Sequence, residues 1–188
     1  MESATAPPLS HDQIHQALAQ AFPSAGLSFK PGRVPSTIVP VESLHAVLRH
    51  LRDDPALRFD YPASITAIDY MDEFELVYQL RSLSRRHDVN VKCRLERESA
   101  VAPSSFDIWP GADFQEREVY DMFGIRFEGH PNLTRILLWD EFVGYPLRKD
   151  YGLPAPLPPD VEQALARGEI LNPPPKPGPR ALDERGAE

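Results

Sequence analysis

Apolar residues recur at helical spacing in two stretches of the first third of the chain. In the first stretch they are Ile14, Ala17, Leu18, Ala21 and Phe22, and in the second Val41, Leu44, Leu48 and Leu51. Side chains three or four residues apart share one face of an α-helix, so each stretch predicts an amphipathic helix. Ser10 and Gln13 have the spacing of a capping box, which places the start of the first helix after Ser10.

The middle of the chain instead alternates apolar and polar positions, as strands with one buried face do. The alternating apolar residues are Phe74, Leu76, Tyr78 and Leu80 in one run and Val89, Val91, Cys93 and Leu95 in the next; only Val77 breaks the pattern. Shorter extended stretches are expected at 26–30, 36–39 and 65–69, and the connections at 70–73 and 84–88 suit hairpins. The order is helix, two strands, helix, three strands. It predicts a two-layer α+β domain with a mainly antiparallel sheet.

A third helix is expected from Asp113, with Glu116 completing a capping box and Gly124 as the left-handed residue that ends it. Glu116 falls in the middle of an apolar helix face, because the other members of that face are Ala112, Val119, Tyr120 and Phe123. A buried carboxylate needs a partner. We therefore expect a buried network in which Glu116 meets Arg135 or Arg148. The alternative is a solvated helix face followed by a basic loop.

The chain divides into four parts by composition. Residues 1–9 are expected to be a flexible N-terminus, 10–112 the α+β domain, and 113–151 the third helix with an irregular continuation. Regular patterning fades after Phe127, and residues 152–188 hold nine prolines in 37 positions. Apart from a short helix expected at 160–167, this tail is predicted to be extended, polyproline-like chain.

Charge and cysteine content exclude several classes of function. The net charge of −8 and the pI near 5.3 argue against a nucleic-acid-binding surface, which needs a clustered basic face. The single cysteine, Cys93, cannot form an internal disulfide or an all-cysteine metal site. No run approaches the roughly 18 apolar residues needed to span a bilayer, so we expect any membrane association to be indirect.

Candidate chemistry within the chain is sparse. His11 and His15 have the spacing of two metal ligands on a helix, but no third ligand is near them in sequence. Cys93 lies on the apolar side of its strand, which favours core packing over reactivity. His130 is interpreted as a hydrogen-bonded structural histidine. The sequence has no Gly-rich phosphate loop or nucleophile elbow, so no cofactor-binding site is predicted.

The region after residue 113 also carries a family resemblance. The residues concerned are Glu116-Arg117-Glu118, Tyr120-Asp121-Met122-Phe123-Gly124-Ile125, Gly129-His130-Pro131, Leu133, Arg135-Ile136-Leu137 and Pro146-Leu147-Arg148-Lys149-Asp150-Tyr151. In this order they resemble the signature of the 30-kDa subunit family of respiratory complex I, the proton-pumping NADH:quinone oxidoreductase. The resemblance is nearly gapless over about 40 residues and weaker in the first half of the chain.

The resemblance implies a structural and assembly subunit of the peripheral arm, without catalytic, cofactor-binding or metal-binding residues of its own. The complex would use FMN, iron–sulfur clusters, NADH and quinone, held by other subunits. The expected partners are the large quinone-site subunit and the neighbouring iron–sulfur subunits, on the cytoplasmic side of the bacterial inner membrane. The residues expected to contact partners or fix the signature are Glu116, Arg117, Glu118, Asp121, His130, Arg135, Leu147, Arg148, Lys149, Asp150 and Tyr151.

The segment 146–151 is either a free basic turn or an anchor. In the anchor, Leu147 and Tyr151 bury against a partner while Arg148 makes a bidentate carboxylate contact. The chain departs from the family at Tyr145, where a histidine is common, and in its proline-rich tail.

Three other functions remain open on the sequence alone. The first is an equivalent subunit of a membrane-bound hydrogenase or of a quinone oxidoreductase with another electron donor. The second is a stand-alone enzyme using Glu116 and Glu118, although these lie about 200° apart around a helix and do not share a face. The third is an adaptor that uses the polyproline stretch at 173–179.

Overall fold

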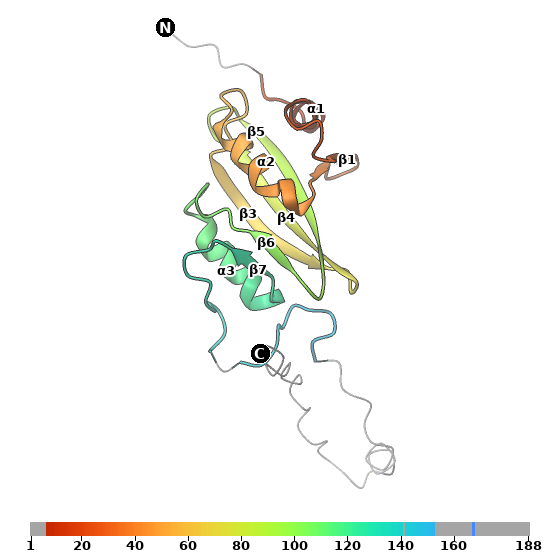
Figure 1. Ribbon diagram of the computed structural model, residues 1–188, viewed down its shortest axis with the longest axis vertical. Helices are drawn as coiled ribbons and strands as arrows, with labels where there is room; N and C mark the ends of the chain where they lie inside the picture. Colours follow the sequence, from red (N-terminus) through yellow and green to blue (C-terminus); the bar gives the residue numbers. More distant parts are fainter. Residues whose placement is uncertain (1–6, 141, 153–166, 168–188) are drawn as a thin grey trace.

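The structure is a computed structural model that describes residues 7–140, 142–152 and 167. Up to β5 the elements follow the predicted order, and Figure 1 shows helices packed on a curved sheet. In chain order they are α1 (His11–Ala21), β1 (Ser28–Lys30), β2 (Ser36–Ile38), α2 (Val41–Asp53), β3 (Tyr61–Asp69), β4 (Glu73–Ser82), β5 (His87–Glu96), β6 (Val101–Pro103), α3 (Ala112–Phe123) and β7 (Arg126–Glu128). The predicted α+β class is confirmed. Apart from 152 and 167, the expected proline-rich tail lies outside the described residues.

Five strands form the main sheet in the order β1-β2-β5-β4-β3. Neighbouring strands are antiparallel except β2 and β5, which run parallel. The two expected hairpins are present: β3 and β4 join through 70–72, and β4 and β5 through 83–86. Strand β3 begins four residues before the expected 65, and a bulge lies between Pro62 and Ser64.

The core lies between the sheet and the helices α1 and α2. The helix stripes predicted from sequence supply Ile14 and Leu18 from α1 and Leu44, Leu48 and Leu51 from α2, all fully buried. They pack over the alternating side chains of β4 and β5. The capping box of α1 is also confirmed, since Ser10 N donates to Gln13 Oε1 at 2.9 Å and Gln13 N donates to Ser10 Oγ at 3.3 Å.

The break in alternation at Val77 reflects a buried polar pair on the other face of the sheet. Val77 lies opposite Lys92 on β5 and is only 7% exposed. Lys92 Nζ donates to Glu75 Oε1 at 2.6 Å, and Glu75 is buried. A lysine stem covers apolar surface while its charged end pairs with a carboxylate. Side chains therefore shield Val77 from solvent on the outer face of the sheet.

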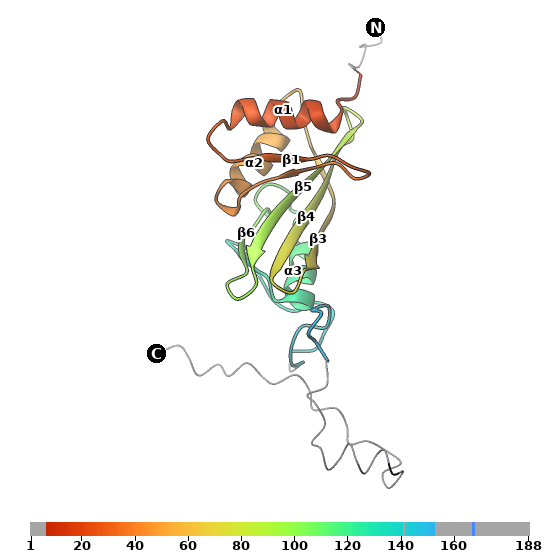
Figure 2. The same ribbon diagram turned by 90° about the vertical axis from the view of Figure 1, so that its right-hand side faces the viewer.

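The last part of the domain departs from the sequence prediction. The sequence patterns predict no strand at 98–112, yet 101–103 form β6, which pairs in parallel with β7. Helix α3 and this strand pair lie together at the end of the molecule away from α1 in both views (Figures 1 and 2). The described residues include no helix with the length and apolarity required to cross a bilayer.

Candidate partner-docking surface

Helix α3 holds the edge of the main sheet through Gln115. The Gln115 side chain accepts a hydrogen bond from Ile65 N at 2.6 Å and donates to Pro62 O at 3.1 Å. These two backbone groups flank the bulge in β3, where the ladder to β4 shifts. An unpaired strand edge exposes backbone donors and acceptors, so Gln115 both closes this edge and fixes α3 against it.

Glu116 is fully buried, but its partners differ from those predicted. Ser104 Oγ donates to Glu116 Oε2 at 2.6 Å, while Ser105 N and Ser105 Oγ donate to Oε1 at 2.7 and 2.6 Å. Neither Arg135 nor Arg148 contacts it, so the predicted ionic network is wrong in its members. Burial raises the pKa of Glu116, and the three hydrogen bonds offset only part of that rise.

The predicted capping box at the start of α3 is also wrong. The helix begins at Ala112, its N-cap is Gly111, and no side chain caps it. The Glu116 carboxylate points toward the 104–105 loop instead of the helix N-terminus. The other end is as predicted: Gly124 ends α3 in the left-handed conformation with φ 75°.

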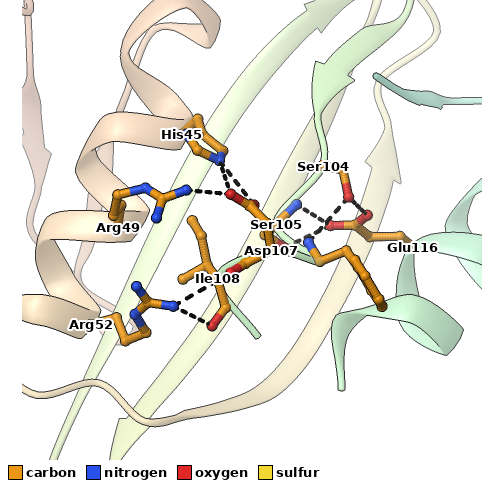
Figure 3. A network of polar contacts seen from close by, with 9 residues as sticks. His45, Arg49, Arg52, Ser104, Ser105, Asp107, Ile108 and Glu116 are labelled. Carbon is orange, nitrogen blue, oxygen red and sulfur yellow. Dashed lines mark hydrogen bonds and ion pairs between the residues drawn. The ribbon is translucent and has the colours of Figure 1, made fainter. Parts of the chain in front are cut away.

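The loop that Glu116 holds is fixed from its other side by α2 (Figure 3). Asp107 accepts from His45 Nε2 at 3.0 Å and pairs with Arg49, and Arg52 donates to Ile108 O at 2.8 Å. Burial alone would raise the pKa of Asp107, but His45 and Arg49 lower it below its ordinary value. The loop therefore joins α2 to α3 through polar contacts on both flanks.

Asp121 organises the irregular chain that follows β7. Its Oδ2 accepts three successive backbone N–H groups, those of residues 136, 137 and 138, at 3.1, 2.8 and 2.9 Å. Its Oδ1 accepts from Arg135 Nη1 at 2.6 Å. Burial alone would raise the pKa of Asp121, but these hydrogen bonds outweigh it and hold the pKa below its ordinary value. A fully buried carboxylate thus fixes a segment without regular secondary structure.

Two arginines complete the attachment of this segment. Arg117 donates to Thr134 O at 3.1 Å and to Arg135 O at 3.0 Å. Arg135, besides pairing with Asp121, donates to Phe142 O at 3.0 Å. Arg117, Asp121 and Arg135 were all predicted signature residues, and the structure brings them together as one polar network that holds the backbone of residues 134–138 and 142.

Arg148 and Tyr145 pack on the end of α3. Arg148 Nε donates to Phe123 O at 2.6 Å, and its guanidinium lies 4.4 Å from the Tyr145 ring centroid. A cation at a helix C-terminus is favourable because the last carbonyls carry partial negative charge. A Cβ added at Gly124 would come within 2.5 Å of the Tyr145 ring and 2.6 Å of Arg148 Nη2. Gly124 is therefore required both by its φ and by this close approach.

Asp69 was not among the predicted site residues. It joins the sheet to the irregular chain that follows β7, which we call the C-terminal segment. It lies at the end of β3, is nearly fully buried, and accepts from Met71 N at 2.7 Å and from Lys149 N at 2.8 Å. Arg97 pairs with it and also with Asp150, the latter at 2.7 Å. No local pattern could have revealed it, because its partner Lys149 is 80 positions away.

The remaining predicted site residues lie in different environments. Glu118, Leu147, Lys149 and Asp150 are exposed. The His130 side chain is buried, with Nδ1 accepting from Asn132 N at 3.1 Å, which confirms a hydrogen-bonded structural histidine. Tyr151 is partly buried and stacks on Phe142 at 6.0 Å between ring centroids. The proposed anchor is thus used partly within the chain.

Large apolar side chains are exposed along the segment that Asp121 and the arginines hold. We call Leu137, Trp139, Val143 and Leu147 the C-terminal apolar surface; each is between 44% and 63% exposed. Sequence reasoning named only Leu147. The missed signal was a cluster of apolar residues in a stretch without helical or strand periodicity. Several exposed apolar side chains along one short segment mark an interaction site more often than a single one does.

Three candidate residues for chemistry, His11, His15 and Cys93, are accounted for by packing or hydrogen bonds. His11 Nε2 lies 3.4 Å from Asn90 Nδ2, and His15 stacks on Phe29. Cys93 is fully buried, as predicted, and burial raises its pKa to about 12. Within the part of the chain that the structure describes, no three His, Cys, Asp or Glu side chains are grouped so that they could hold a metal ion.

A small α+β domain carries the irregular chain that follows β7. Buried polar side chains of the domain hold the backbone of this chain, and its apolar side chains are exposed to solvent. A family model described as the respiratory-chain NADH dehydrogenase 30-kDa subunit matches residues 37–156. The chain belongs to this family.

Relatives with curated names agree with this family. The C subunit of NADH-quinone oxidoreductase from Salinispora tropica is 39% identical over 163 residues, covering 81% of this chain and 66% of that protein. The equivalent protein of Moorella thermoacetica is 40% identical over 145 residues, covering 76% of this chain and 95% of that protein. The C/D subunit of Acidiphilium cryptum is 46% identical over 129 residues, 63% of this chain and 22% of that longer protein.

Solved structures show the same fold. A trypsin-resistant fragment of Nqo5 superimposes with a TM-score of 0.56 at 28% identity, covering 64% of this chain and 99% of the fragment. A chain of the archaeal membrane-bound sulfane sulfur reductase superimposes with a TM-score of 0.63 at 27% identity, covering 88% of this chain and 95% of its own length.

Proposed function

We propose that this chain is a non-catalytic structural and assembly subunit in the peripheral arm of a proton-translocating NADH:quinone oxidoreductase. It supports electron transfer from NADH to quinone by holding other subunits in place. The family membership and the names of the relatives support this proposal. The chain spans only about two thirds of the length of the Salinispora relative.

The observation that carries the proposal is the C-terminal apolar surface on its polar support. Burying one large apolar side chain contributes about 1.5–3 kcal/mol, so several held in one rigid segment can form the centre of an interface. Because the segment is already fixed by Asp121, Arg117 and Arg135, little conformational entropy is lost on binding.

The partner we propose is the large quinone-site subunit, next to the iron–sulfur subunits. The C/D protein of Acidiphilium cryptum supports this choice, because fusion places the two units in one assembly. FMN, the iron–sulfur clusters, NADH and quinone would be bound by other subunits. The complex would lie at the cytoplasmic face of the bacterial inner membrane, with this chain attached through its partners.

A matched pair of double variants tests the surface. In the test variant, Leu137→Ser is combined with Leu147→Ser, which are 63% and 54% exposed. In the control, Leu83→Ser is combined with Val34→Ser, which are 63% and 55% exposed and lie outside the C-terminal segment. Similar apolar area is lost in both double variants, so they differ mainly in where on the protein surface it is lost.

Each tagged full-length variant is purified from detergent-solubilised membranes, its partners are identified by mass spectrometry, and NADH:quinone activity is assayed. We expect the wild type and the control to retain the large subunit, iron–sulfur subunits and activity, and the test variant to lose them. Iron–sulfur partners without NADH oxidation would instead favour the hydrogenase-like or other-donor alternative. A wild-type chain that elutes alone would refute the proposal.

A further inference from the structure

The turn between β3 and β4 exposes two large apolar side chains. Tyr70 and Met71 are 44% and 46% exposed, although they follow directly on the buried end of β3. The turn is closed by a hydrogen bond from Tyr70 N to Glu73 O at 2.9 Å. We call Tyr70 and Met71 the hairpin tip.

Met71 adopts a backbone conformation that a side chain disfavours. Its φ is 74°, in the left-handed region where Gly and Asn are common and other residues are strained. The Asp69 carboxylate holds it there, since Oδ1 accepts from Met71 N at 2.7 Å. Strain kept at an exposed position by a buried carboxylate is an outlier that points toward function.

The same carboxylate places the hairpin tip beside the C-terminal segment. Asp69 Oδ2 accepts from Lys149 N, and Lys149 Nζ lies 5.8 Å from the Tyr70 ring centroid. Leu147, a member of the C-terminal apolar surface, is two residues from this contact. The hairpin tip therefore lies beside residues 147–149, at the end of the stretch that carries the C-terminal apolar surface.

Two cations at this end are held by groups other than carboxylates. Asp150 and Asp69 are paired with Arg97, whereas Arg148 and Lys149 form no ion pair with any carboxylate among the described residues. Their side chains contact aromatic rings and a backbone carbonyl. A positive patch at an interface is typically met by a negative patch on the partner, so a partner surface that covers Arg148 and Lys149 is expected to carry carboxylates.

We propose that the hairpin tip is a second anchor on the large subunit, with Met71 entering an apolar recess whose rim carboxylates face Arg148 and Lys149. This inference rests on the proposed function, because it takes the same subunit as the partner. It adds a contact from the β3–β4 turn to the contacts proposed for the C-terminal apolar surface, although Asp69 and Lys149, which hold the two regions together, are 80 positions apart in the sequence.

Met71→Gly tests the proposal because it separates binding from folding. Glycine accepts the left-handed conformation, so the variant loses the side chain while the backbone strain is relieved. Arg86→Gly is the matched control, since Arg86 has φ 62° in the turn between β4 and β5, the other turn of the β3–β4–β5 meander. Met71→Asn is the second test variant, because Asn also tolerates this conformation while being polar.

Immobilised full-length variants are titrated with the purified large subunit of the same complex, and folding is checked by circular dichroism. We expect Met71→Gly and Met71→Asn to raise Kd about tenfold or more, as loss of an interface anchor does, with thermal unfolding no lower than that of wild type. Arg86→Gly should bind like wild type. If wild type binds and both Met71 variants bind equally well, the hairpin tip is not an anchor and the proposed function stands. If wild type does not bind, the proposed function fails with it.

Discussion

Replacing Asp121 with Asn should detach the C-terminal segment from the domain. Asp121→Asn keeps the shape of the side chain but removes its charge and one acceptor oxygen. Three backbone N–H groups and Arg135 Nη1 now share the two oxygens of Asp121. The amide offers one oxygen, and its NH₂ group must face either the N–H groups or the guanidinium, all of which are donors.

The magnitude follows from these contacts. A hydrogen bond to a charged group contributes about 1.5–3 kcal/mol, and leaving a buried charge without its partner costs about 3–5 kcal/mol. We expect the attachment of residues 135–138 to the domain to weaken by about 3 kcal/mol or more. If the lost attachment energy exceeds the free energy of opening the C-terminal segment in wild type, this segment opens while the rest of the domain stays folded. The free energy of global unfolding then falls by less than the attachment energy that was lost.

Two measurements separate local from global loss. Hydrogen exchange should show early deuteration of the amides of residues 136–138 in the variant, while the amides of β4 and β5 stay protected. Chemical denaturation gives the global change. The control is Asp88→Asn, whose carboxylate pairs with Arg81 at an exposed position and should not change stability measurably. Wild-type protection at 136–138 in Asp121→Asn would refute the reasoning.

The effect should also depend on pH. The pKa of Asp121 in the folded protein lies below its ordinary value, so its contribution is fully present above the unfolded pKa of about 3.9. It is lost as the pH falls through the folded pKa. The stability difference between wild type and Asp121→Asn should therefore be constant near neutral pH and shrink only in strong acid.

Three further predictions concern the groups around α3. Gly124→Ala should destabilise the protein by about 1–3 kcal/mol more than Gly129→Ala, measured by denaturation; both have positive φ, but only Gly124 faces Tyr145 and Arg148 closely. Glu116→Gln should flatten the dependence of the unfolding free energy on pH. Because the pKa of Glu116 is raised in the folded protein, wild type loses stability as pH rises from about 4.3 through the folded pKa. Identical pH profiles for the two proteins would contradict this. Asp107→Asn should speed hydrogen exchange at 105–109 without affecting β5, because Asp107 joins the loop to α2.

Local patterns in the sequence were enough to establish most of the elements and the family. Helical and alternating patterns act over neighbouring residues, so the stripes of α1 and α2 and the alternation of β4 and β5 were predictable. The capping box at Ser10 and the left-handed Gly124 are also local features, and both are confirmed. The ordered signature from 116 to 151 indicated the family to which the chain belongs.

Which groups meet depends instead on long-range packing. Glu116 lies on an apolar face, so its burial could be predicted, but nothing local distinguishes arginines that follow it from two serines that precede it. Asp69 reads as an ordinary strand end until Lys149 is brought to it across 80 positions. Periodicity reports which way a side chain faces, whereas its partner depends on how distant segments pack. The docking surface depends on that packing, because its irregular backbone is fixed by α3 and the sheet.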